Sequence, residues 1–354
     1  MKSVVDDLDV PIDDWVQQMM LWHFSEETGS SFWLKQKLTF DFNPLTDITC
    51  LDDLKKFGLF DKSVLRPLPL IDLLPKGLAH LPRRVVETGG TTGAPCRALD
   101  ITTGQYNISL FRIMLEERGL LGGNVVAMTP SGPHAYGHFV KALTDTWQGN
   151  CFSIDFDPRW VKHLIQQNQP TTGYIAHILE QTQYLLEQQN PQLLFTTSKL
   201  LLEVAAHMPK PLNEYGIKGV FTGGTSCSFE EERQLKNHFL EGIQWIDTYG
   251  NTLMGHALQG DPWKGCQHRA YYLPPPQAFI SVVNPENWQQ KMPVGERGQV
   301  LLQTLHRDLF IPNLLERDSA FTVPAHPWFP FSGVAGVQPF TEGKGQEEMT
   351  EGVY

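Results

Sequence analysis

Apolar residues along the middle of the chain follow two alternating patterns. The segment 105–120, QYNISLFRIMLEERGL, has apolar residues at helical spacing and ends near Gly119, which predicts a helix. Short apolar runs, such as NVVAM at 124–128 and KGVF at 218–221, predict buried strands. Further strands are expected at 151–154, 173–177 and 243–248, with helices at 137–147, 158–168, 178–188, 198–207 and 229–240. Strands that alternate with helices of this length predict an α/β fold with covered, largely parallel sheets.

The two ends of the chain differ from its middle in composition. Residues 12–38 are rich in Trp, Phe and Met, which predicts one or two amphipathic helices, and the proline-rich stretch 64–84 predicts an extended connector. After about residue 261 prolines cluster, and the runs AFISVV and GQVLLQT predict strands of a smaller β-rich lobe. We therefore expect four parts, namely a helical and extended segment packed on the core (1–80), an α/β core (81–260), the β-rich lobe (261–340) and a polar tail (341–354).

Charge and cysteine content exclude several classes of protein. The net charge of −11 argues against a nucleic-acid binder and against docking on an anionic membrane surface. No apolar run approaches the roughly 20 residues of a membrane span. The 5 cysteines are scattered and form no C-x-x-C pair, which disfavours a disulfide framework and a structural zinc site. The acidic N-terminus lacks the apolar core of a signal peptide, so we expect a cytoplasmic protein.

The stretch ETGGTTGAP at 87–95 is the clearest candidate for a binding loop. We expect it to join a strand to a helix, so that its backbone N–H groups, aided by the helix dipole, form an anion cradle. Thr91 and Thr92 add hydroxyl donors. The stretch is neither a Walker A loop, which needs a lysine after its second glycine, nor G-x-G-x-x-G. A turn that binds nothing is the alternative.

This stretch and four others resemble the motifs of adenylate-forming enzymes, which include acyl-CoA synthetases, adenylation domains and luciferase relatives. TGGTTGAP resembles their phosphate loop, and PHAYG (133–137) resembles the Pro-x-x-x-Gly element beside the acid pocket. FTGGTSCS (221–228) and DTYGNT (247–252) resemble the two elements around adenine. The segment 295–320 resembles the Gly-Glu-x-Gly block. Each motif alone is weak, but the five occur in the family's order over about residues 80–340.

The resemblance implies a role for each matching residue. The ATP phosphates would be held by Thr88, Gly89, Gly90, Thr91, Thr92 and Gly93. Adenine and ribose would be held by Gly223, Gly224, Thr225, Asp247, Thr248, Tyr249, Gly250, Asn251, Thr252 and Asp318. The acid pocket would be lined by His134, Ala135, Gly137 and Phe221. By this resemblance, the core (81–260) would bind nucleotide and acid, and the β-rich lobe (261–340) would complete the ribose site.

Physical reasoning supports these roles and leaves alternatives open. Gly223, Gly224 and Tyr249 follow predicted strands, and open α/β sheets bind ligands at the carboxyl ends of their strands. Tyr249 would stack on adenine, and the alternative is a core aromatic residue. Asp318 would accept the ribose hydroxyls, and the alternative is a partner for Arg317 or Arg307. His134 is either a pocket residue or a hydrogen-bonded loop histidine.

The chain departs from the family pattern at three points. Cys96 stands where the family has a lysine, and Arg97 is the candidate for the missing charge. Leu253 stands where the family has a magnesium-binding glutamate, so no metal ligand is assigned, and Mg²⁺ would rest on ATP phosphates, water and a threonine hydroxyl. No hinge follows Asp318, and Lys344 is a poor substitute for the lysine of the family's mobile C-terminal domain, which we expect to be absent.

These features resemble the phenylacetate-CoA ligase-like branch in a compact form, like the aryl-acid-activating enzymes of phenazine antibiotic tailoring. The resemblance implies ATP-dependent activation of an aryl or otherwise apolar acid as acyl-AMP, with ATP and Mg²⁺ as cofactors. The acceptor would be CoA, a carrier protein or an amine, and the compact size makes a homodimer reasonable. One alternative is an acyl-protein synthetase that uses Cys227 as nucleophile, and another is a nucleotide-binding protein that has lost its chemistry.

Overall fold

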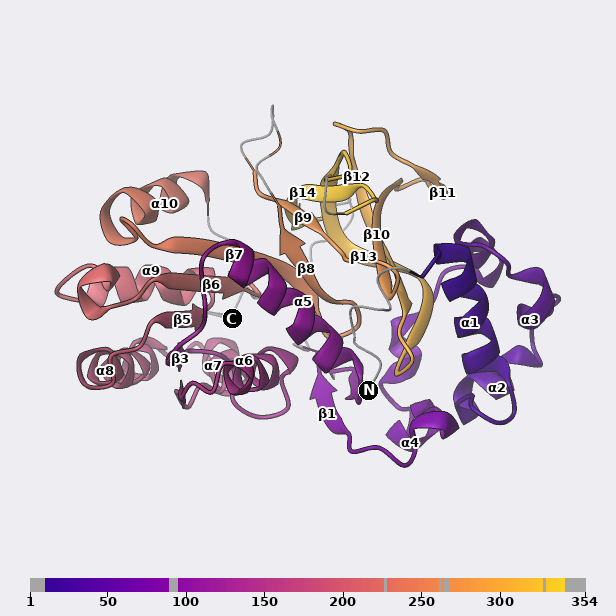
Figure 1. Cartoon of the computed structure of the whole chain (residues 1–354), viewed down its shortest axis with the longest axis horizontal. Coiled ribbons are helices and arrows are strands. Elements are labelled where there is room, and N and C mark those ends of the chain that lie inside the picture. The colour runs from indigo at the N-terminus through magenta and orange to yellow at the C-terminus, as the bar shows by residue number, and fades with distance from the viewer. Residues whose placement is uncertain are drawn as a thin grey trace. The chain divides into compact units, whose positions relative to one another are not determined.

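The computed structural model describes residues 10–88, 95–225, 228–260, 263, 268–326 and 329–340 (Figure 1). The chain divides into two compact units. Unit 1 comprises Met1–Leu110 and Asn251–Gln346, and unit 2 comprises Phe111–Gly250 and Glu347–Tyr354. The predicted tail at 341–354 lies outside the described residues. None of the helices in the described ranges combines the length and the apolar character that crossing a bilayer requires.

Unit 2 is built on a parallel sheet with the strand order β4-β3-β5-β6-β7. The strands are β3 (Val125–Ala127), β4 (Cys151–Ser153), β5 (Leu193–Thr196), β6 (Gly219–Gly223) and β7 (Gln244–Asn251). The helices are α5 (Thr103–Glu117, which begins in unit 1), α6 (Ala135–Thr146), α7 (Pro158–Gln166), α8 (Thr172–Gln188), α9 (Ser198–His207) and α10 (Phe229–Gln234), with the short turns η5 (Leu212–Tyr215) and η6 (Leu235–Phe239). This arrangement confirms the predicted covered parallel sheet.

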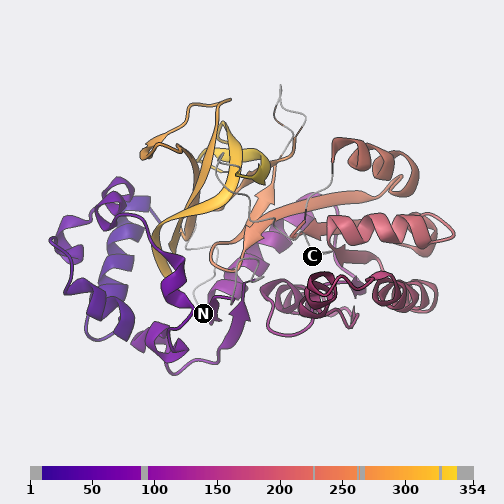
Figure 2. The same ribbon diagram turned by 180° about the vertical axis from the view of Figure 1, so that it is seen from behind.

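Helices cover both faces of this sheet because side chains alternate along each buried strand. On one face, Phe221 of β6 stacks on Phe195 of β5 and contacts Phe111 of α5, which in turn packs against Phe139 of α6. On the other face, the alternate residues Val126, Leu194 and Val220 pack against apolar residues of α7, α8, α9 and η6. Figure 2 shows the chain from behind, with α9 running alongside the strands of unit 2. Both faces are therefore apolar, as expected for parallel strands.

Unit 2 differs from the predictions at three points. Residues 173–177, predicted as a strand, form the first turns of α8, where Ile175, Ile178 and Leu179 point into the core at helical spacing. Strand β5 was not predicted, although all four of its residues are buried. The helix expected at 229–240 is divided, because α10 ends at Gln234 and η6 continues as a π-helical turn.

Unit 1 contains an antiparallel sheet with the strand order β8-β9-β14-β13-β12-β10-β11. Its strands are β8 (Gly255–Gln259), β9 (Ala270–Tyr272), β10 (Ala278–Asn284), β11 (Asn287–Lys291), β12 (Arg297–Leu305), β13 (Phe310–Val323) and β14 (Gly333–Pro339). The runs predicted as strands at 278–283 and 298–304 are β10 and β12, so the expected β-rich lobe is present.

The N-terminal part of unit 1 is helical. It contains α1 (Ile12–Phe24), α2 (Ser31–Lys37), α3 (Pro44–Asp47), α4 (Leu70–Leu73) and the 3₁₀ turns η2 (Leu51–Phe57), η3 (Lys62–Leu65) and η4 (Lys76–Leu78). The first two helices confirm the helical prediction for 12–38. The predicted extended connector is wrong in detail, because short turns interrupt it between its prolines.

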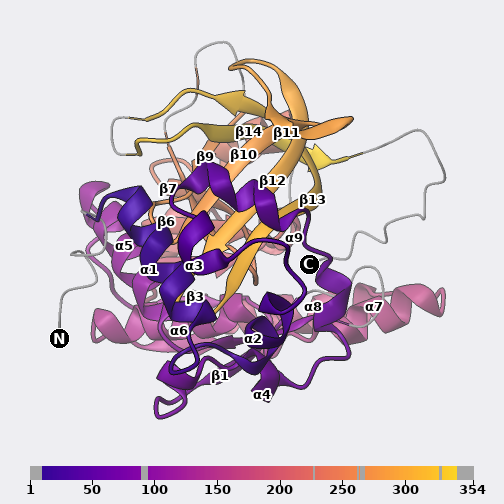
Figure 3. The same ribbon diagram turned by 90° about the vertical axis from the view of Figure 1, so that its right-hand side faces the viewer.

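Helix α1 is fixed to the turn between β12 and β13 by three hydrogen bonds. Trp15 Nε1 donates to the carbonyl of Leu305 at 3.1 Å, and Trp22 Nε1 donates to the carbonyl of Arg307 at 2.9 Å. His23 Nε2 donates to the carbonyl of His306, which lies between them, at 2.8 Å. Figure 3 shows α1 alongside β12 and β13. Three successive carbonyls of a turn are thus satisfied by one helix.

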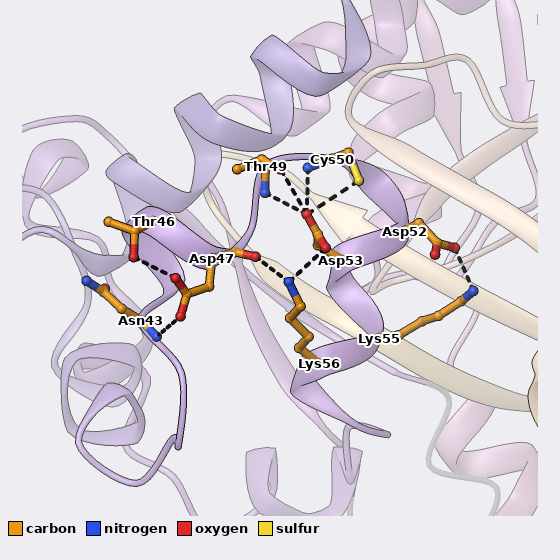
Figure 4. A network of polar contacts seen from close by, with 9 residues as sticks. All are labelled: Asn43, Thr46, Asp47, Thr49, Cys50, Asp52, Asp53, Lys55 and Lys56. Atoms are coloured by element: carbon orange, nitrogen blue, oxygen red, sulfur yellow. Dashed lines mark hydrogen bonds and ion pairs between the residues drawn. The ribbon is translucent and has the colours of Figure 1, made fainter.

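A polar network holds the next turns of the N-terminal part (Figure 4). The Asp53 carboxylate accepts hydrogen bonds from the backbone nitrogens of Thr49 and Cys50, and Lys56 Nζ lies 2.8 Å from its other oxygen. The Lys56 hydrogen bond, together with the backbone N–H groups, lowers the pKa of Asp53 below its usual range. The ionised carboxylate therefore caps η2 and ties it to the residues before it.

Candidate functional site

The predicted phosphate loop joins two antiparallel strands. Strands β1 (Arg84–Glu87) and β2 (Arg97–Asp100) form a hairpin in which Glu87 is paired with Arg97. The prediction that the loop leads into a helix is wrong, because α5 begins only after β2, at Thr103. The helix-dipole argument for an anion cradle therefore does not hold here.

Two hydrogen bonds join Thr88 and Cys96, the two ends of the loop, which we call its foot. Thr88 N donates to the carbonyl of Cys96 at 2.9 Å, and Cys96 N donates to Thr88 Oγ1 at the same distance. The other predicted phosphate-binding residues lie outside the described residues, namely Gly89, Gly90, Thr91, Thr92 and Gly93. The two bonds bring the ends of the loop together whatever the loop binds.

Two ion pairs lie at the foot of the loop. Arg97 Nε is 2.9 Å from Glu87 Oε1, and Lys62 Nζ is 3.0 Å from Glu316 Oε2. Both carboxylate side chains are largely buried, at 8% and 10% exposure, so each of these charges needs its partner. Arg97, the sequence-based candidate for the missing loop charge, is thus paired with Glu87.

Asn251 and Thr252 connect the nucleotide motif to these two pairs. Asn251 Nδ2 donates to Glu316 Oε1 at 3.0 Å, while Thr252 Oγ1 donates to the carbonyl of Glu87 at 3.2 Å. Asn251 Oδ1 also accepts from the backbone nitrogens of Leu253 and Met254. Two neighbouring residues of the predicted motif, Asn251 and Thr252, therefore each contact one of the two ion-paired glutamates.

Leu253 is a core residue. It is only 2% exposed, and its carbonyl accepts a hydrogen bond from Thr304 Oγ1 at 2.8 Å. A leucine offers no oxygen ligand from its side chain, and the described ranges contain no group of three or more His, Cys, Asp or Glu residues that could hold a metal ion. The Leu253 side chain therefore cannot bind a magnesium ion.

Asp318, the predicted ribose residue, lies on β13 two residues after Glu316. It is partly exposed and is in register with Pro339 of β14. Its neighbour Ser319 accepts a hydrogen bond from the Arg297 guanidinium at 3.0 Å, which ties β13 to β12. Asp318 thus belongs to a strand that is hydrogen-bonded on both sides.

In unit 2, the predicted adenine loop follows the carboxyl end of β6. Gly223 ends this strand, and a Cβ atom there would lie 2.6 Å from Thr248 Oγ1. Thr248 Oγ1 donates to the carbonyl of Thr222 at 3.1 Å. Gly224 has a φ of +82°, which favours glycine, and Thr225 Oγ1 accepts from Lys199 N at 3.2 Å. Position 223 therefore needs glycine so that β7 can approach β6 closely.

Asp247, beside this loop on β7, has a buried carboxylate. It accepts a short hydrogen bond from Thr222 Oγ1, which itself accepts from Trp245 Nε1 at 3.0 Å. Tyr249 and Gly250 follow on the same strand and are partly exposed, unlike the buried core aromatic residues of this unit. Tyr249 is thus more accessible than a core residue.

The predicted acid-pocket residues lie in two different environments. His134 precedes α6 and is 4% exposed, and Ala135 is the first residue of that helix. A Cβ atom on Gly137 would lie 2.4 Å from the carbonyl of Pro130, so only glycine fits there. Phe221 is 1% exposed and stacks on a neighbouring core ring. Phe221 is therefore a residue of the core of unit 2.

Sequence reasoning missed several residues around these motifs. Lys62, Glu87 and Glu316 form the ion pairs at the loop foot, and Thr222 holds Asp247. Lys62 is separated from Glu316 by 254 positions. Of these contacts, only the pairing of Glu87 with Arg97 could have been expected from the sequence, because the two residues flank the glycine-rich loop.

Comparisons with known proteins identify the fold. No protein-family model matches the sequence, and no match is found among proteins of curated function. Among solved structures, the chain is similar to 2-hydroxyisobutyryl-CoA ligase in an open conformation with 2-HIB-AMP and CoA, with a TM-score of 0.64 and 14% identity over 93% of this chain and 72% of that chain. The same ligase in its thioesterification state gives a TM-score of 0.65 and 15% identity, over 95% of this chain and 67% of that chain. The postadenylation state of the ligase with R3-HIB-AMP gives a TM-score of 0.64 and 13% identity, over 92% of this chain and 65% of that chain. The chain therefore has the fold of an acyl-CoA ligase and spans about two thirds of that ligase's length.

Proposed function

We propose that the chain activates a carboxylic acid with ATP, forming an acyl-adenylate and releasing pyrophosphate. The observation that carries the proposal is the fold shared with a ligase whose structures hold an acyl-adenylate. The position of the adenine loop supports it, because that loop follows the carboxyl end of β6, where open α/β sheets bind ligands. Thr88 to Gly93 would hold the phosphates, Gly223 to Thr225 and Asp247 to Thr252 the adenine side, and Asp318 the ribose.

In the proposed reaction, a carboxylate oxygen attacks the α-phosphorus of ATP. The bond from the α-phosphorus to the bridging oxygen breaks, and pyrophosphate leaves with the electron pair. The protein contributes mainly by orienting the reactants, which is worth roughly 7–11 kcal/mol of a barrier in well-oriented systems. Hydrogen-bond donors that already face the phosphates would add charge stabilisation. Mg²⁺ would enter bound to the triphosphate, because Leu253 stands where the family has a magnesium-binding glutamate.

The finer assignments rest on the sequence motifs. We propose an aryl or otherwise apolar acid in a pocket lined by His134, Ala135 and Gly137, with transfer to CoA, a carrier protein or an amine. The phenylacetate-CoA ligase-like branch and a role in cytoplasmic antibiotic biosynthesis belong to the same proposal, as does a homodimer. In this proposal residues 81–260 bind nucleotide and acid, and residues 261–340 complete the ribose site.

A second candidate is a protein that binds the nucleotide without catalysing its reaction. The burial of Leu253, where a magnesium-binding glutamate is expected, favours this candidate. The acyl-protein synthetase alternative depends on Cys227, which lies outside the described residues. Alkylation of Cys227 that abolishes acyl transfer and spares adenylate formation would support that alternative.

The proposal is tested by trapping the intermediate. The protein is incubated with MgATP, hydroxylamine and each of a panel of aryl and fatty acids, and hydroxamates are identified by mass spectrometry. A hydroxamate from one class of acid identifies the substrate class. Binding of ATP without a hydroxamate from any acid would favour the binding protein instead.

A further inference from the structure

We propose that two copies of the chain associate through helix α10, which packs antiparallel to the same helix of the second copy about a two-fold axis. The inference rests on the homodimer of the proposed function and names the face that forms it. Helix α10 (Phe229–Gln234) belongs to none of the motifs. Figures 1 and 2 show it next to α9 at one end of unit 2.

The first argument is that α10 has an uncovered face. All 6 residues of this helix are described and none of them is buried, and the Phe229 side chain is 52% exposed. The chain enters the core only in the following turn η6, where Leu235 and Phe239 are buried. Helices of globular proteins ordinarily bury an apolar stripe, so α10 has a face available to a partner.

The second argument is that this face is already ordered. Ser228 and Glu231 form a capping box, in which Ser228 N donates to Glu231 Oε2 at 2.6 Å and Glu231 N donates to Ser228 Oγ at 3.3 Å. Glu232 forms an ion pair with Lys236 one turn later. Because local bonds already hold the helix, a partner that binds it has little conformational freedom to remove.

The third argument is the order of the charges. Arg233 Nη2 lies 2.8 Å from Glu230 Oε1 of the same helix. A guanidinium has five N–H donors, and this bond uses one of them. When two α10 helices meet antiparallel, Glu230 of each copy faces Arg233 of the other, because a two-fold axis repeats every contact. The face is therefore complementary to itself in charge.

Phe229 supplies the apolar part of the same contact. It precedes Arg233 by four positions, so the two side chains lie on one face of the helix. In the antiparallel pair, the ring of one copy meets the Arg233 side of the other, where a guanidinium can stack on an aromatic face. Phenylalanine and arginine are both enriched in interfaces. The helix is short, so we expect a weak, concentration-dependent dimer.

The test measures the dissociation constant of the dimer by sedimentation velocity, at protein concentrations up to the order of 100 µM. We expect the wild type to dimerise and Phe229→Ser to weaken the dimer about tenfold or more. Tyr184→Ser is the matched control, because it removes a comparably accessible ring, 63% exposed, from α8. It should leave the dissociation constant unchanged. Equal effects of the two variants would overturn the inference.

Charge reversal tests the pairing across the axis. Glu230→Arg and Arg233→Glu should each be monomeric alone, because like charges then face each other in the dimer. An equimolar mixture of the two variants should regain the dimer, since each arginine of one chain meets a glutamate of the other. Mixing cannot repair a pair within one helix, so a mixture that stays monomeric would overturn the inference.

Failure of this inference and failure of the proposed reaction are distinguishable. A monomeric wild type would overturn the inference and the homodimer, and it would leave the formation of an acyl-adenylate standing. A dimer that Phe229→Ser dissociates, in a protein that gives no hydroxamate with any acid, would overturn the reaction and support the inference.

Discussion

The carboxylate of Asp308 lies 2.8 Å from the backbone nitrogen of Thr102, immediately before helix α5. It also accepts hydrogen bonds from the backbone nitrogens of Ile101 and Thr103, at 2.7 and 3.1 Å. The first turn of α5 contains no acidic residue of its own. A carboxylate from the β12–β13 turn, more than 200 positions away, therefore caps this helix.

We expect Asp308→Ala to lower the free energy of unfolding by about 2–4 kcal/mol, because three partly buried N–H groups lose a charged acceptor. Asp308→Asn should lose less, since an amide oxygen still accepts hydrogen bonds. Urea unfolding followed by circular dichroism measures the change. Asp52→Ala, which removes a 74% exposed partner of a surface pair, is the control and should change stability by less than about 0.5 kcal/mol. Equal effects of Asp308→Ala and Asp52→Ala would refute the capping role.

Two buried histidines predict a stability loss in mild acid. Burial lowers the pKa of His23 to about 4, although its bond to the His306 carbonyl and the nearby Asp308 oppose the shift. Burial likewise lowers the pKa of His306 to about 4. In the unfolded chain histidine titrates near 6.5, so between pH 6.5 and 4 the unfolded state binds more protons. Stability should therefore be full above about pH 6.5 and fall as the pH drops toward 4.

Each of these histidines can contribute a slope of up to about 1.4 kcal/mol per pH unit in this window. Unfolding free energies at pH 7, 6 and 5 measure the slope, above the range where most carboxylates titrate. His23→Gln keeps a donor for the His306 carbonyl and should reduce the slope by up to that amount. A slope that does not change in this variant would contradict the assignment.

Gly223→Ala tests the close approach of β6 and β7. The added Cβ atom would lie 2.6 Å from Thr248 Oγ1, so the hydroxyl must move and its hydrogen bond to Thr222 must weaken. We expect a loss of about 1–3 kcal/mol in stability. Gly173→Ala is a matched control in α8, where a Cβ atom meets nothing within 4 Å, and it should be neutral or stabilising. The close-approach argument fails if both alanines are equally tolerated.

Leu253→Glu tests whether the missing glutamate can simply be restored. Leu253 is 2% exposed, so a carboxylate there would be buried without a partner, and we expect a clear drop in melting temperature. Acid-dependent pyrophosphate exchange should not rise above the wild-type rate. Leu253→Met, which keeps an apolar side chain, should retain the wild-type melting temperature. A stable Leu253→Glu protein with faster exchange would show that this position still faces the metal.

The α/β alternation was predictable because most buried elements carry a local pattern. Strand β6 and helix α9 fall where apolar runs and periodicity place them. Residues 173–177 were misassigned because the apolar pair Tyr174-Ile175 looks like a strand until Ile178 and Leu179 are counted on the same helical face. Strand β5 was not predicted because it has only four residues and ends two positions before α9 begins. Its short apolar run is therefore hard to separate from that of the helix.

The candidate site was predictable only where its residues are close in sequence. The glycine-rich stretch stands out in the sequence, but the hairpin that flanks it was not predicted, because β2 is a four-residue strand that contains Arg97 and Asp100. The ion pair of Lys62 with Glu316 joins residues 254 positions apart, and no local pattern predicts such a contact. Long-range pairs of this kind depend on the tertiary fold, which single-sequence patterns do not contain.

The central claim is that this chain forms an acyl-adenylate. The most direct measurement is acid-dependent exchange of labelled pyrophosphate into ATP, with Mg²⁺ and a panel of aryl and fatty acids. We expect exchange with one class of acid, and none when the acid is left out. Measurable ATP binding with no exchange for any acid in a broad panel would contradict the claim and favour a nucleotide-binding protein.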